Sequence, residues 1–185
     1  AGFSVRDKGR DWDDAEMIPV RRAVSWQLER HAPYPGIALD RLWTIREANG
    51  VALALFGAFG IGRGDSLLDL MTMEMLPSVV ENWPEVAHHA AARLRTESAA
   101  LGGIPEFDPV IRYLSDVPQT RVWPNSPVIP TIINQGSVRL SMFATISQFG
   151  TPEDLLLDDL KVELYFPMDD VTEMAFQAMN AEQAS

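Results

Sequence analysis

The 185-residue sequence contains no cysteine and only three histidines. The lack of cysteine excludes disulfides and thiolate metal ligands, and it fits a protein of the reducing cytoplasm. No apolar run approaches the roughly 20 residues that a membrane-spanning helix needs, and the first residues lack the apolar core of a secretory signal. We therefore expect a cytoplasmic protein with no membrane association.

Positive charge is also scarce, because 15 Lys and Arg residues stand against 26 Asp and Glu residues, a formal net charge of -11. Such a surface repels nucleic acid phosphates, so the chain alone is not expected to bind DNA. The opening residues AGFSVRDKGRDWDD are polar, lack periodicity and do not start with methionine. We interpret residues 1–13 as a linker from a missing upstream domain and residues 14–185 as one domain with a substantial core.

Patterns typical of catalysis or metal binding are missing as well. The adjacent His88 and His89 would point about 100° apart on a helix, and no third ligand stands at a recognised spacing. The glycine-rich stretch GAFGIGRGDS lacks the Gly-Lys-Ser/Thr ending of a phosphate loop and follows a predicted helix. We therefore expect no enzyme activity, no metal and no cofactor.

Apolar periodicity and proline or glycine breaks predict the order of the elements. A helix over residues 14–31 precedes two short strands at 36–40 and 42–48, and helices follow at 49–56, 66–76, 78–101 and 107–114. Three more strands are predicted at 128–134, 138–149 and 160–166, before a last helix. In the last strand, apolar residues alternate with Lys161, Glu163 and Tyr165, which predicts one buried face and one face in water.

This order predicts an α+β fold, in which an antiparallel sheet of about five strands has helices packed on one face. The PAS fold has this arrangement. A cavity between the sheet and the helical layer is then the expected ligand site.

The stretch HAPYPGIALDRLWTIREANGVALALFG resembles the first half of the MmyB-like ligand-binding domain of XRE-type helix-turn-helix transcription regulators. Family positions are matched by His31, Pro33, Tyr34, Pro35, Asp40, Arg41, Trp43, Ala48 and Asn49. The likeness continues through ENWPEVAHHAAARLRTES and FGTPEDLLLDDLKVELYFPMDD. One departure is clear, because SPVIPTIINQGSVRL stands where many members carry a His-Pro-x-Val-Gly motif.

The resemblance implies a PAS-like sensor whose pocket holds a fatty acid or a similar lipid, and whose DNA contacts belong to the missing N-terminal domain. Independently, Met71, Met73 and Met75 crowd one predicted helix, and methionine gives a compliant lining for a flexible acyl chain. Burial of such a chain contributes about 0.8 kcal/mol per CH₂. The alternative function is a lipid carrier or an enzyme that uses the same cavity.

The predicted apolar lining, with ordinary core packing as the alternative for each residue, consists of Leu39, Trp43, Leu68, Met71, Met75, Val80, Trp83, Leu164 and one of Met142 and Phe143. A buried carboxylate also needs a polar partner. The candidates for this anchor are Asn49, which could equally be a helix cap, together with Asn82, Arg95 and Arg139.

Assembly can be predicted from the first helix. Regulators that read two DNA half-sites commonly have paired sensor domains. Ile18 and Trp26 form a second apolar patch beside the core stripe of helix 14–31. We therefore expect a homodimer in which this helix contributes contacts and transmits the state of the pocket. The alternative is that Trp26 folds back onto its own sheet.

Overall fold

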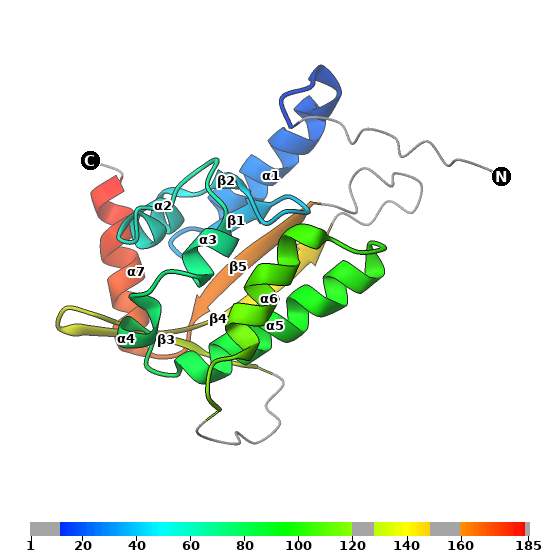
Figure 1. The fold of residues 1–185 in the computed structure, drawn as a ribbon. Helices are drawn as coiled ribbons and strands as arrows, with labels where there is room; N and C mark the ends of the chain where they lie inside the picture. Colours follow the sequence, from blue (N-terminus) through cyan, green and yellow to red (C-terminus); the bar gives the residue numbers. More distant parts are fainter. Residues whose placement is uncertain (1–11, 120–127, 149–159, 184–185) are drawn as a thin grey trace.

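The computed structural model describes residues 12–119, 128–148 and 160–183. The predicted linker therefore lies almost entirely outside the described residues. The described part forms an antiparallel sheet in the order β2-β1-β5-β4-β3 (Figure 1). Its strands are β1 (Gly36–Leu39), β2 (Ile45–Ala48), β3 (Thr131–Gln135), β4 (Val138–Gln148) and β5 (Lys161–Pro167). The α+β fold with a five-stranded PAS-like sheet, predicted from the sequence, is confirmed.

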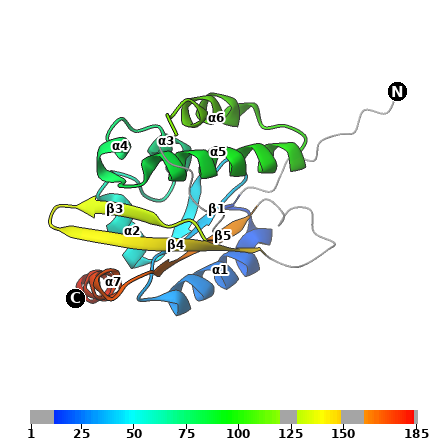
Figure 2. The ribbon, with the colours of Figure 1, turned by 90° about the horizontal axis from the view of Figure 1, so that it is seen from below.

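The helices lie on both sides of this sheet and not on one face only, as the sequence had predicted, because the first and last helices pack on the second face (Figure 2). One face is covered by α3 (Leu67–Met71), α4 (Leu76–Val79), α5 (Trp83–Ala100) and α6 (Asp108–Ser115), and the short turn η2 (Pro105–Phe107) precedes α6. On the other side lie α1 (Ile18–His31), which continues the turn η1 (Ala15–Met17), and α7 (Asp170–Gln183). Helix α2 (Gly50–Gly57) packs on β1 and α7.

The turn of the first hairpin is longer than predicted, because β1 ends at Leu39 and β2 begins at Ile45 and not at residue 42. The Oδ1 atom of Asp40 accepts hydrogen bonds from the backbone N–H groups of Leu42 and Thr44, each at 2.9 Å. Trp43, which lies between Leu42 and Thr44, has a φ of 62°, a left-handed conformation that is uncommon for a bulky residue. The turn thereby directs the Trp43 ring into the core, where it is fully buried.

Two predicted helices are shorter than the periodicity suggested. The helix predicted at 66–76 ends at Met71, and the one predicted to start at residue 78 begins at Trp83, just before Pro84. Between these helices, Val80 forms an isolated bridge with Ile133 of β3. The connection leaves Met75 44% exposed.

The prediction of a wet face on β5 is wrong. Lys161 is 6% exposed and Glu163 is 3% exposed, while Val162 on the opposite face is fully buried against α1. The strand lies at the centre of the sheet, paired with β1 and β4, and α5 covers the face that carries the charges. Charged residues can be buried here because α5 supplies partners of opposite sign, as described below.

Asn49 connects the first hairpin to the helix that precedes it in sequence, α1, and to the helix that follows it, α2. Its Oδ1 atom accepts hydrogen bonds from the N–H groups of Ala52 in α2 (3.0 Å) and Gly36 in β1 (3.2 Å). Its Nδ2 group donates to the carbonyls of Leu28 (3.1 Å) and Tyr34 (2.8 Å). Of the two roles considered for Asn49, the structure supports the helix cap.

We predict that Asn49→Ala lowers the free energy of unfolding by about 2–4 kcal/mol, because it removes an N-cap and leaves partly buried backbone groups unpaired. Asn49→Asp keeps the acceptor oxygens and should lose only part of this stability. Urea denaturation of both variants measures the difference. A loss below about 0.5 kcal/mol for Asn49→Ala would contradict the assigned role.

Candidate functional site

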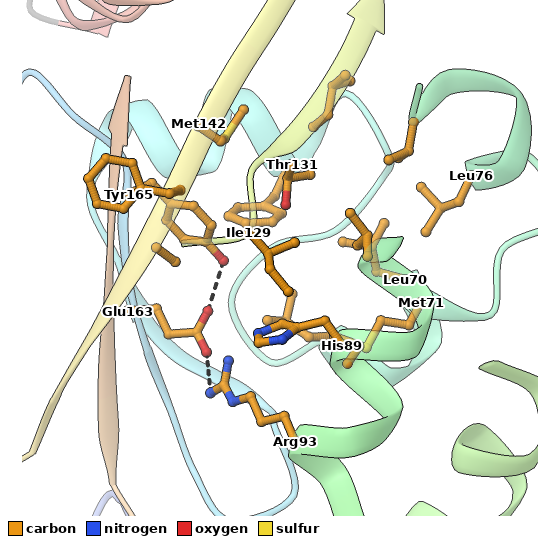
Figure 3. Close-up of a pocket in the computed structure, with 18 of the residues that line it drawn as sticks. Leu70, Met71, Leu76, His89, Arg93, Ile129, Thr131, Met142, Glu163 and Tyr165 are labelled. Atoms are coloured by element: carbon orange, nitrogen blue, oxygen red, sulfur yellow. Dashed lines mark hydrogen bonds and ion pairs between the residues drawn. The ribbon is translucent and has the colours of Figure 1, made fainter. Parts of the chain in front are cut away.

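A cavity of about 390 Å³ lies between the helical layer and the inner face of the sheet (Figure 3). This volume is in the range of pockets that hold small molecules. Most of the wall is apolar and is formed by Trp43, Leu55, Phe56, Phe59, Leu67, Leu70, Met71, Leu76, Val80, Trp83, Val86, Ala90, Val128, Ile129, Ile133, Met142, Phe143, Ala144 and Ile146.

Polar groups gather at one part of the wall, where α5 faces β5. Figure 3 shows His89 and Arg93 projecting from α5 and Glu163 and Tyr165 projecting from β5. The Arg93 Nη2 and Glu163 Oε1 atoms form an ion pair at 2.5 Å. The Tyr165 hydroxyl donates a hydrogen bond to Glu163 Oε2 at 2.9 Å. The remaining described polar residues that line the cavity are Thr131 and Thr145.

Glu97 and Lys161, which do not line the cavity, extend this network of ion pairs around the Trp43 ring. Glu97 accepts a hydrogen bond from Arg93 Nε at 2.9 Å and one from Trp43 Nε1 at 2.8 Å, and it forms an ion pair with Lys161. The Arg93 guanidinium lies 4.3 Å and the Lys161 ammonium 4.6 Å from the centre of the Trp43 ring, within cation–π range. We call Arg93, Glu97, Lys161 and Glu163 the charge quartet.

The pKa shifts in this region follow from burial and pairing. Burial alone would lower the pKa of Arg93, but the Glu163 and Glu97 carboxylates raise it above its usual value. Burial raises the pKa of Glu97, yet the Lys161 ammonium and other donors bring it below the ordinary value. For Lys161 burial dominates and lowers the pKa.

Two uncharged titratable groups of the wall, His89 and Tyr165, have shifted pKa values as well. The pKa of His89 is lowered, first by burial and then by the Arg93 charge, so the imidazole is neutral at pH 7. Burial and the Glu163 carboxylate raise the pKa of Tyr165 well above its usual value, so its hydroxyl keeps its proton and remains a donor.

Residues 20–179 match the model of a protein family, the MmyB-like transcription regulator ligand binding domain. The chain belongs to this family. No curated protein matches the chain. The cavity described above is therefore the cavity of an MmyB-like ligand-binding domain, and the sequence-based identification of the family is confirmed.

The MmyB-like domain brings six of the residues that were expected at the ligand site to the wall of the cavity: Trp43, Met71, Val80, Trp83, Met142 and Phe143. Met142 and Phe143 are neighbours on β4, so their side chains point to opposite faces of the sheet. Met142 is buried in the main core, while the Phe143 ring stacks on Phe166 with 5.4 Å between the ring centres. Phe166 in turn packs against His31 of α1. Of these two wall residues, Met142 is therefore the one whose side chain points toward the cavity, whereas Phe143 borders the cavity but directs its ring to the α1 side of the sheet.

The other apolar candidates lie away from the cavity wall. Leu39 and Leu68 are buried in the core cluster but do not line the cavity. Leu164 packs on the α1 side of the sheet, and Met75 lies on the surface.

None of the four polar candidates lines the cavity. Asn49 caps α2, and Asn82 joins α5 to the strand region, because it donates to the Pro130 carbonyl and accepts from the Ile132 N–H. Arg95 contacts Ser115 of α6. Arg139 pairs with Glu81 at 2.7 Å and 3.0 Å on the surface.

Within the described part of the chain, the cation that lines the wall is Arg93, which was not among the predicted site residues. A signal for it existed in the sequence, because Arg93 shares the helical spacing of Trp83, Val86 and Ala90, all of which face the cavity. Glu163 and Tyr165 were missed because the alternation in β5 was interpreted as an exposed face. His89 was considered only as a metal ligand.

Two negative findings complete the description of the site. Among residues 12–119, 128–148 and 160–183, no group of three or more His, Cys, Asp or Glu side chains is placed to hold a metal ion. Within the same ranges, no helix is both long and apolar enough to cross a membrane.

We predict that Glu97→Gln lowers the free energy of unfolding at pH 7 by about 2–4 kcal/mol, because Lys161 and Arg93 lose a charged partner. The figure is below that of a fully buried pair, since the Glu97 side chain is 22% exposed. A lowered pKa in the folded state means that the stabilisation is present above pH 4.5, the ordinary pKa of glutamate, and is lost as the pH falls through the folded pKa.

The difference between wild type and Glu97→Gln should therefore narrow below pH 4.5, which urea denaturation at pH 7, 5 and 3.5 measures. Glu81→Gln is the matched control, because Glu81 pairs with Arg139 on the surface. Its loss should be much smaller, since exposed ion pairs contribute little. Equal losses for the two variants would contradict a stabilising role of the charge quartet.

Proposed function

We propose that the chain is the ligand-sensing domain of a bacterial one-component transcription regulator, and that its cavity binds a fatty acid or a similar apolar small molecule. The observation that carries the proposal is the apolar cavity in a member of a regulator ligand-binding family. DNA binding would belong to a separate helix-turn-helix domain, since the net charge of -11 disfavours contact with phosphates. Such a regulator acts in the cytoplasm.

The wall of the cavity suits a ligand with a long apolar part and one polar end. Leu70, Met71 and Leu76 form an apolar region on the helical side, and the polar groups gather where α5 meets β5 (Figure 3). An acyl chain against the apolar walls gains about 0.8 kcal/mol per buried CH₂. Flexible methionine side chains, Met71 and Met142, adapt to its shape.

A lipid carrier or an enzyme could use the same cavity. Family membership supports a regulator domain over both alternatives. A helix-turn-helix encoded upstream of Ala1 would support the sensor, and its absence would support the carrier.

The two faces of β5 suggest how the cavity could communicate with the rest of a regulator. Glu163 and Tyr165 face the ligand side, while Val162 on the other face packs in one cluster with Leu28 of α1. The His31 ring at the end of α1 is also hydrogen-bonded to the Tyr165 carbonyl at 2.9 Å. We infer that a ligand that shifts β5 also shifts α1.

The same helix carries the surface proposed for dimer formation. Trp26 is 62% exposed and Ile18 is 48% exposed, and the Arg30 guanidinium lies 5.6 Å from the centre of the Trp26 ring. Exposed tryptophan is a common anchor of protein interfaces. The exposure of Trp26 supports a homodimer through α1 over the alternative in which the ring packs on its own sheet.

We predict that Met71→Asp weakens binding of dodecanoic acid at least tenfold, because a carboxylate on the cavity wall opposes the apolar chain. Met75→Asp is the matched control, since Met75 is a nearby exposed residue that does not line the cavity. Displacement of a fluorescent fatty acid measures both affinities. Unchanged binding by Met71→Asp, or equal losses in both variants, would argue against this cavity as the ligand site.

We also predict that Trp26→Glu shifts the chain from dimer to monomer, because the charge would be buried at the interface. Sedimentation velocity over a range of protein concentrations measures this shift. Met174→Glu changes an equally exposed apolar residue on α7 and should leave the dimer intact. If the wild-type chain sediments as a monomer with and without dodecanoic acid, the proposed role of α1 in assembly is wrong.

A further inference from the structure

Among the described residues, the charged side chains at the polar end of the cavity sum to no net charge. The charge quartet contains two cations, Arg93 and Lys161, and two carboxylates, Glu97 and Glu163, and each cation is paired with a carboxylate. His89 is the other titratable side chain of α5 at the wall, and it is neutral at pH 7 because burial and the Arg93 charge lower its pKa. No other element contributes a charged side chain to the described lining.

The charge of each cation in the quartet is already balanced by a carboxylate. The Arg93 guanidinium is held by Glu163 on one side and by Glu97 on the other, and the Trp43 ring lies against it. Lys161 pairs with Glu97 and also lies against the Trp43 ring, so it is covered from the cavity.

An ionised ligand head group at this end would therefore leave one uncompensated negative charge in a buried region. Such a charge is strongly disfavoured in a site of low dielectric, and it is removed most readily by a proton. Two carboxylates that share one cation commonly hold one proton between them. Glu163 is the group positioned to share it, since its Oε1 atom lies 2.5 Å from Arg93 Nη2 at the cavity wall.

We propose that a carboxylic acid binds this cavity together with one proton from the solvent, which is held between the ligand carboxyl group and Glu163 beside Arg93. The proposal rests on the proposed function and specifies how the same site recognises its head group. It makes the affinity for an acid depend on pH, whereas an uncharged ligand of equal length binds without this dependence.

Calorimetric titration of the 185-residue chain tests the proposal with two probes, dodecanoic acid and dodecanamide. Because a proton taken up by the complex is released by the buffer, the heat measured in phosphate and in Tris gives the number of protons bound per ligand. We expect one proton for the acid and none for the amide. The dissociation constant of the acid should rise about tenfold per pH unit between pH 6 and 8, while that of the amide stays constant.

The variant Glu163→Gln tests whether the charge balance of the quartet causes the proton uptake, because the loss of one carboxylate leaves the quartet with one net positive charge. An ionised acid should then bind without a proton, and the pH dependence of its dissociation constant should disappear. Glu81→Gln makes the same substitution at an exposed site outside the cavity and should still bind the acid with one proton.

The possible results separate the two proposals. Wild-type protein that binds the acid without proton uptake would overturn the inference and leave the proposed function standing, as would Glu163→Gln that still takes up one proton. If neither dodecanoic acid nor dodecanamide binds, the proposed function fails and the inference fails with it.

Discussion

The ion pair between Arg93 and Glu163 connects the longest helix of the domain to the central strand of its sheet, and much of the remaining structure depends on it. Glu163 is 3% exposed, and a carboxylate at that depth would be strongly destabilising without a charged partner. Arg93 supplies the partner and is itself held by Glu97. Trp43 completes the arrangement, because its ring lies against Arg93 and its Nε1 group donates to Glu97.

The position of the Trp43 ring beside Arg93 and Glu97 explains the unusual turn before β2. For the Trp43 ring to reach α5, the backbone adopts a φ of 62°, and Asp40 stabilises that conformation by accepting two backbone hydrogen bonds. Asp40 also pairs with Arg46 of β2, which fixes the turn to the strand that follows it. A locally unfavourable backbone is thus maintained by a side chain at the turn and by the buried cluster that the Trp43 ring joins.

The sequence was sufficient to predict the fold, but only part of the site. Helical and strand periodicities and the resemblance carried by HAPYPGIALDRLWTIREAN predicted the α+β arrangement, because these signals are local. The polar wall depends on contacts between residues far apart in sequence. Lys161 and Glu163 look like the exposed face of a strand until α5 is placed over them, and Arg95 looks as suitable as Arg93 until the helix face is known.

The same contacts limit how the domain could signal. A ligand shifts a conformational equilibrium only by the difference between its affinities for the two states. Apolar walls that contain Met71 and Met142 adapt to many shapes and discriminate weakly between states. A buried ion pair discriminates more strongly between conformational states, because a movement that separates the two charges leaves each of them unpaired, at a large cost in free energy. Glu163 lies on β5, and the other face of this strand packs against α1. A change in the ion pair of Glu163 on binding of the proposed head group would therefore act directly on the strand that contacts α1.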